Sequence, residues 1–136
     1  MAAEVFVDTS AWYAIAVREG DSTRVESALR TCIRARTRLV TTNLIVAETH
    51  ALLLRRAGYP AAMAFVREVR RPPIVTVLSS IEIEDSAMRR WLERFDDQLF
   101  SFTDAVSFAV MTERRIREAL TLDGHFATAG FAMLPA

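Results

Sequence analysis

The segment Val5-Phe6-Val7-Asp8-Thr9-Ser10-Ala11, close to the start of the chain, indicates the class of fold. Its three apolar, β-prone residues predict a buried strand. The Asp-Thr-Ser that follows predicts the start of a helix, because short polar side chains bond the free backbone amides of a first helical turn. A strand that passes directly into a helix is the repeating unit of an α/β fold.

The same alternation continues along the chain. Apolar segments predict further strands at residues 39–41, 74–78, 119–122 and 131–134. Helices are predicted at about residues 11–18, 23–33, 43–56, 60–71, 79–95 and 103–113, with Thr23–Glu26 and Ser79–Glu82 as capping pairs. The strands are apolar throughout, which is typical of a parallel sheet covered on both faces. We therefore expect one α/β domain over residues 1–136, with a central parallel sheet of four to five strands flanked by helices.

Composition excludes several classes of protein. Of the 136 residues, 51% are apolar and 25% are charged, which excludes a disordered chain. No apolar run approaches the ~20 residues of a membrane helix, and Met1–Glu4 lack the basic and apolar features of a secretory signal. The one cysteine, Cys32, cannot form an internal disulfide, which suits a reducing compartment. We expect a cytoplasmic protein without a membrane partner.

All seventeen basic residues are Arg, and they balance seventeen acidic residues. The absence of Lys excludes Schiff-base chemistry and the phosphate-binding loop that ends in Lys. Because the net charge is zero, binding of a nucleic acid would depend on metal ions and local Arg groups rather than on an overall basic field.

Four carboxylates are predicted to meet at one edge of the sheet. Asp8 and Asp123 follow the first and fourth predicted strands, and Asp104 lies in the first turn of a helix. These positions share the edge where parallel sheets bind ligands, at a reversal of the strand order. Glu48 lies about a turn and a half into the helix after the second strand, in an apolar stretch where burial of an unpaired carboxylate is costly.

Such a cluster requires a compensating charge, because carboxylates repel one another. The natural compensator is Mg²⁺ or Mn²⁺, hard cations that take oxygen ligands and retain water. A cation of this kind eases deprotonation of its water and neutralises charge on a phosphoryl oxygen, so the pattern predicts hydrolysis of a phosphate ester. Taken alone, however, an Asp at a helix start is more often a cap than a ligand.

Three motifs and a closing segment resemble those of PIN-domain ribonucleases. The segments are Val5–Ala11, Thr42–Thr49, Ser101–Met111 and Leu120–Phe126, the last followed by Ala129-Gly130-Phe131. They stand in the family order and span nearly the whole chain. The chain is most similar to the VapC toxins of type II toxin–antitoxin pairs.

The resemblance implies a PIN-like fold and a Mg²⁺-dependent endoribonuclease, with Mn²⁺ as a substitute, that hydrolyses RNA with metal-activated water. It implies Asp8 and Asp104 as the principal metal ligands, Asp123 as a direct or water-mediated ligand, and Glu48 as the last member of the catalytic acidic centre. It also implies a homodimer and a cognate antitoxin protein that blocks the site. Four hydroxyl side chains are implied to orient the carboxylates: Thr9, Ser10, Thr103 and Ser107.

Two neighbouring residues have open roles. His125, two residues after Asp123, is interpreted as a histidine of a surface loop in preference to a contact with RNA. Asp97 matches a position that is often acidic in these toxins, and it is interpreted as a helix-end residue or one that supports the site.

Two other classes of function stay open. One is a different metal-dependent phosphohydrolase, acting on small molecules or DNA; the lack of Lys and of an Asp-x-Asp strand end argues against the aspartyl-phosphate type. The other is a non-catalytic domain that binds RNA or a protein partner. The presence of all four acidic residues argues against it.

Overall fold

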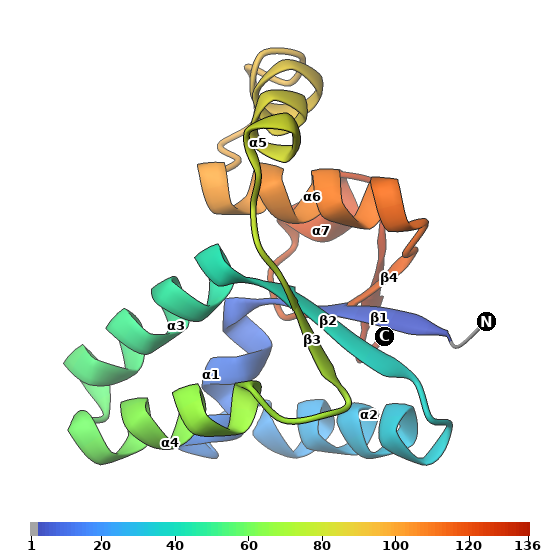
Figure 1. Ribbon diagram of the computed structural model, residues 1–136. Coiled ribbons are helices and arrows are strands. Elements are labelled where there is room, and N and C mark those ends of the chain that lie inside the picture. The colour runs from blue at the N-terminus through green and yellow to red at the C-terminus, as the bar shows by residue number, and fades with distance from the viewer. Residues whose placement is uncertain (1–2) are drawn as a thin grey trace.

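Five parallel strands form one sheet in the computed structural model, which describes residues 3–136 (Figure 1). The strand order is β3-β2-β1-β4-β5, and each neighbouring pair is parallel. The strands are β1 (Glu4–Val7), β2 (Arg38–Thr42), β3 (Ile74–Val77), β4 (Glu118–Leu120) and β5 (Ala132–Leu134). The predicted α/β class and parallel sheet are confirmed. Met1 and Ala2, part of the segment predicted to lack a secretory signal, lie outside the described residues.

Helices lie on both faces of the sheet (Figure 1). One group packs together on one face and consists of α1 (Thr9–Val17), α2 (Ser22–Arg34), α3 (Asn43–Arg56) and α4 (Tyr59–Val69). The other face carries α6 (Phe102–Arg114) and the short α7 (His125–Thr128), and α5 (Ile81–Ala87) packs on the outer side of α6. No helix within residues 3–136 is long and apolar enough to cross a membrane.

Phe108 of α6 is the centre of an aromatic cluster that joins three parts of the chain. Its side chain is fully buried. Its ring centroid lies 5.0–5.7 Å from those of four other aromatic residues, Trp91, Phe100, Phe126 and Phe131. These residues come from the segment after α5, the turn before α6, and the α7–β5 region. The cluster therefore packs α6 against the segment after α5 on one side and against the α7–β5 region on the other.

Both predicted capping pairs are wrong. Thr23 already lies inside α2, which begins at Ser22 after Asp21 and has no side-chain cap. In α5 the cap is Ser80, whose hydroxyl accepts a hydrogen bond from the Ile83 amide at 3.2 Å. Ser79 instead donates to Glu84 at 2.7 Å. A one-residue shift in the start of the helix accounts for the second error.

The single helix predicted at residues 79–95 is interrupted. After α5 the chain forms a π-helical turn, η1 (Met88–Leu92), in which the Glu93 amide donates to the Met88 carbonyl five residues earlier. The wider turn changes which side chains share a helical face. Here the rings of Trp91 and Phe95 stack with centroids 5.6 Å apart, and both extend the aromatic cluster.

Removal of the Phe108 ring is expected to destabilise the domain strongly. Phe108→Ala should lower the free energy of unfolding by about 3–5 kcal/mol, because it leaves a cavity where four rings meet. Phe102→Ala is the matched control on the same helix: that ring is 45% exposed, so a loss of about 1 kcal/mol or less is expected. Urea denaturation of both variants measures the difference, and equal losses would contradict the central role of Phe108.

Candidate active site

The candidate site lies where the strand order reverses. Across the sheet the strand numbers decrease from β3 to β1 and then increase from β4 to β5, so the order reverses between β1 and β4. Asp8 follows β1 directly, and Asp123 follows β4 after two residues. Because β1 and β4 are parallel neighbours, both carboxylates lie at the edge where such sheets bind ligands. The predicted position of the site is therefore consistent with the topology.

Asp8 serves as the N-cap of α1. Its Oδ1 accepts hydrogen bonds from the Ser10 hydroxyl at 2.7 Å and from the Ala11 amide at 3.3 Å. The cap explains why α1 begins at Thr9, two residues before the predicted start. The side chain is only 4% exposed, so the carboxylate is held in one place and is largely withdrawn from water.

The Ser10 hydroxyl connects the two loops that carry Asp8 and Asp123. Besides its bond to Asp8, Ser10 Oγ accepts a hydrogen bond from the Leu122 amide at 2.8 Å and lies 3.3 Å from Thr121 Oγ1. Thr121 Oγ1 in turn accepts from the Asp123 amide at 2.9 Å. The predicted strand covers residues 119–122, but β4 ends at Leu120. Thr121 therefore lies after the strand, and its hydroxyl is part of the site.

Asp104 has a capping role as well. Its amide donates to the Ser101 hydroxyl at 3.0 Å, and its Oδ2 accepts from the Ser101 amide at 3.1 Å, which forms a capping box at the start of α6. These reciprocal bonds satisfy two backbone amides and fix the direction of the carboxylate.

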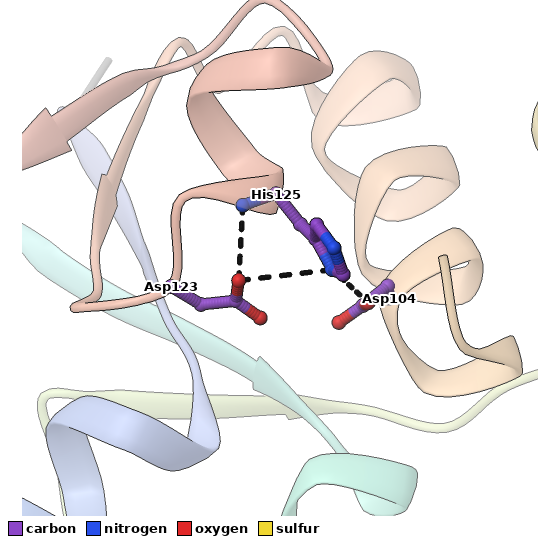
Figure 2. A group of neighbouring side chains, drawn as sticks. All are labelled: Asp104, Asp123 and His125. Atoms are coloured by element: carbon purple, nitrogen blue, oxygen red, sulfur yellow. Dashed lines mark hydrogen bonds and ion pairs between the residues drawn. The ribbon is translucent and has the colours of Figure 1, made fainter. Parts of the chain in front are cut away.

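His125 joins Asp104 to Asp123 (Figure 2). Its Nδ1 lies 3.1 Å from Asp104 Oδ2 and 3.7 Å from Asp123 Oδ1, and its backbone amide donates to Asp123 Oδ1 at 2.9 Å. The ring also packs edge-on against Phe100, with centroids 5.4 Å apart. The interpretation of His125 as a histidine of a surface loop is wrong, because the ring lies between the two carboxylates.

The residues of this cluster fit a hard divalent cation. Asp104, Asp123 and His125 each offer a ligand atom, and these atoms lie within 4.8 Å of one another. The hydrogen bonds of the two carboxylates use Oδ2 of Asp104 and Oδ1 of Asp123, which leaves one oxygen of each without a hydrogen-bond partner among residues 3–136. Oxygen donors of this kind suit Mg²⁺ or Mn²⁺, whereas imidazole is better suited to softer metals. We therefore consider His125 a partner of the carboxylates rather than a main ligand.

Burial raises the pKa of the Asp8 carboxyl to about 7. The charge of Asp123 raises this pKa further, while hydrogen bonds from Ser10, Thr121 and the Ala11 amide act in the opposite direction. The hydrogen bonds of Ser10 to Asp8 and to the Leu122 amide bring Asp8 near the loop that carries Asp123, although Asp8 is not one of the three members of the cluster. A cation beside Asp8 would favour the charged carboxylate.

Two further acidic residues considered for the site are exposed to solvent. Glu48 is exposed on α3 and is not among the three clustered groups, so the expected cost of its burial does not arise. Asp97 is also exposed.

Of the four predicted orienting hydroxyls, Ser10 is the one that contacts a carboxylate in the described part of the chain. Ser107 Oγ donates to the Thr103 carbonyl at 2.8 Å, so its hydrogen is used within α6. Thr9 Oγ1 is buried without a hydrogen-bond partner in that same part. The hydroxyls of Ser107 and Thr9 therefore make no hydrogen bond to a carboxylate among residues 3–136. Thr103 accepts the Ser107 hydrogen bond through its backbone carbonyl.

Sequence reasoning missed Thr121 and Ser101. Thr121 is a polar residue in a segment predicted as an apolar strand, and that combination was the available signal; the structure shows it fully buried just after β4. Ser101 stands three residues before Asp104, the spacing of a capping box.

The chain belongs to the PIN domain family, whose model matches residues 5–132. Among curated proteins, it is 39% identical over 128 residues to the 23S rRNA-specific endonuclease VapC20 of two Mycobacterium tuberculosis strains, CDC 1551 / Oshkosh and ATCC 25618 / H37Rv. The match covers 93% of this chain and 95% of each relative.

The fold is also similar to a solved structure. The crystal structure of Mycobacterium tuberculosis VapC20, described as a sarcin–ricin loop cleaving toxin, superposes with a TM-score of 0.82 at 32% identity. The superposition covers 94% of this chain and 96% of that one. The predicted resemblance to PIN-domain proteins of the VapC type is confirmed.

The raised pKa of Asp8 predicts a pH-dependent stability in buffer that contains EDTA. Unfolded Asp titrates near pH 4, so between pH 4 and pH 7 the folded protein holds a proton that the unfolded chain has lost. Stability should therefore fall as the pH rises through this window, by up to about 1.4 kcal/mol per pH unit. Asp8→Asn, which keeps a capping oxygen, should remove this slope.

Urea denaturation at pH 5 and pH 8 measures this effect. We expect Asp8→Asn to be more stable than the wild type, and the gain to be larger at pH 8. Asp96→Asn, at an exposed position, is the matched control and should leave the slope unchanged. A wild-type protein that gains stability between pH 5 and pH 8, with Asp8→Asn following the same curve, would contradict the assignment.

Proposed function

We propose that this protein is a metal-dependent endoribonuclease and the toxin of a type II toxin–antitoxin pair, with ribosomal RNA as its substrate. The observation that carries the proposal is the pair Asp104 and Asp123, each with a free carboxylate oxygen, at the reversal of the strand order in a PIN domain. The identity to a 23S rRNA-specific endonuclease over 93% of the chain supports the choice of substrate.

Asp104 and Asp123 would hold the cation, with Asp8 beside them. When bound, Mg²⁺ or Mn²⁺ supplies an easily deprotonated water and neutralises charge on the phosphoryl oxygens. The hydroxyls of Ser10 and Thr121 and the Ser101 capping box keep the carboxylates in fixed directions. His125 maintains the orientation of Asp104 through its 3.1 Å contact.

The reaction we propose is hydrolysis that leaves a 5′-phosphate. Water forms a bond to phosphorus, the bond to the 3′ oxygen breaks, and that oxygen leaves as a hydroxyl after it takes a proton. An arrangement of preformed carboxylates suits this reaction, because it would hold the cation in place with little reorganisation while that cation stabilises the charge that develops on the phosphate.

The four remaining predicted residues stay part of this proposal in supporting roles. Glu48, exposed on α3, would complete the acidic centre. Thr9 follows Asp8 directly, and its buried hydroxyl has no hydrogen-bond partner among residues 3–136. Thr103 and Ser107 lie in the first two turns of α6 on either side of Asp104 in sequence, and the hydrogen bond from the Ser107 hydroxyl to the Thr103 carbonyl would support that part of the helix.

We also propose a cognate antitoxin, a homodimer and a cytoplasmic location, in accordance with the VapC type. A basic side chain of the antitoxin, inserted among Asp8, Asp104 and Asp123, would meet complementary charge.

Cleavage of a ribosomal RNA hairpin tests the proposal. Purified protein, free of antitoxin, is expected to cut a synthetic sarcin–ricin hairpin in Mg²⁺ or Mn²⁺ and to lose this activity in EDTA. Asp104→Asn and Asp123→Asn should each lower kcat by about a hundredfold or more, because each removes a charge at the centre of the site. Glu48→Gln should have a smaller effect, in keeping with its exposed position.

Asp96→Asn is the control for a carboxylate outside the site and should retain full activity. Activity that survives both Asp104→Asn and Asp123→Asn would overturn the proposed site. Turnover of a phosphomonoester without cleavage of RNA would instead identify a different phosphohydrolase.

A further inference from the structure

A pocket of about 460 Å³ opens beside the acidic cluster. It is enclosed by α1, by the far part of α3, by the turn between α1 and α2, and by Leu122 after β4. Two of its lining residues are Ser10 and Leu122. The Ser10 hydroxyl donates a hydrogen bond to Asp8 and accepts one from the Leu122 amide. The pocket therefore adjoins the two segments that carry Asp8 and Asp123, and its volume lies in the range of small-ligand sites.

The walls of the pocket have the chemistry of a site for a flat, uncharged ring. Ala14, Val17 and Leu52 supply an apolar lining. Tyr13 is half-buried there, and the guanidinium of Arg56 lies over one face of its ring, with the guanidinium carbon 5.8 Å from the ring centre. An aromatic ring with an Arg beside it is the combination on which proteins stack unpaired RNA bases.

The charges around the pocket favour a base over a phosphate. Glu19 and Asp21 line it at the turn between α1 and α2, and both are exposed. Their carboxylates repel a phosphate but accept hydrogen bonds from the N–H groups of a base. Arg56, by contrast, is exposed and can pair with the phosphate of a nucleotide whose base is inserted.

From this arrangement we propose that the pocket lined by Tyr13, Leu52 and Arg56 takes one unpaired base of the RNA, next to the bond that is cut. The proposal rests on the proposed endoribonuclease function and adds a specificity site to it. Tyr13 provides the stacking surface, and Arg56 holds the adjoining phosphate.

The test compares synthetic sarcin–ricin hairpins in which each loop nucleotide in turn carries an abasic ribose. Binding is measured by fluorescence anisotropy in Ca²⁺, with gels to confirm that the strands stay intact, and cleavage is measured separately in Mg²⁺. The wild type is expected to bind the strand that lacks one particular base about tenfold more weakly than the complete hairpin, because that strand loses a stacked base.

Variants assign the lost affinity to Tyr13. Tyr13→Ala should bind the complete hairpin about tenfold more weakly and should no longer distinguish the abasic strand, whereas Tyr13→Phe keeps the ring and should behave as the wild type. Tyr59→Ala is the matched control, since that ring is 66% exposed on α4 outside the pocket. Arg56→Ala should weaken binding of all strands, and its neighbour Arg55→Ala should not.

Equal wild-type affinity for all strands, or no binding of the hairpin, would overturn the base site and leave a side chain of a protein partner as the remaining occupant. An abasic effect that persists in Tyr13→Ala would also overturn it, because the base would then lie elsewhere. Discrimination in binding without cleavage in Mg²⁺ or Mn²⁺ would support the base site and overturn the endoribonuclease.

Discussion

The parallel pairing of β1 with β4 is the constraint on which the site depends. The register places Phe6 opposite Ala119 and Val7 opposite Leu120, so the two strands end at nearly the same level. Asp8 therefore emerges beside the loop that carries Asp123, and the Ser10 hydroxyl can reach the Leu122 amide at 2.8 Å. A shift of this register would separate the two aspartates and break the bonds of Ser10 at once.

The position of Asp104 depends on a different kind of interaction. α6 does not follow a strand directly, and it is held in place by the aromatic cluster around Phe108. Phe100 belongs to that cluster and also contacts the His125 ring, so apolar packing continues up to the edge of the acidic centre. Strand pairing thus positions Asp8 and Asp123, whereas aromatic packing positions Asp104.

The sequence was sufficient to predict the parallel sheet and the proximity of Asp8 and Asp123, because both follow from strand patterns and a general rule of α/β topology. It was not sufficient for His125 and Thr121, whose roles depend on distances across a loop. The exposure of Glu48 was equally hard to predict: its neighbours in sequence are apolar, yet Glu48 itself is exposed. Helix starts were shifted by one or two residues because adjacent Ser, Thr and Asp residues compete to be the cap.

The double use of Asp8 and Asp104 as helix caps has a genetic consequence. Asn caps a helix about as well as Asp does, and a single base change converts an Asp codon into an Asn codon. The charge that a cation requires can therefore be lost while α1 and α6 keep their first turns. Under the proposed function, folded and inactive alleles would be only one point mutation away for a cell under selection against this protein, and they would still present an intact surface to any protein that binds it.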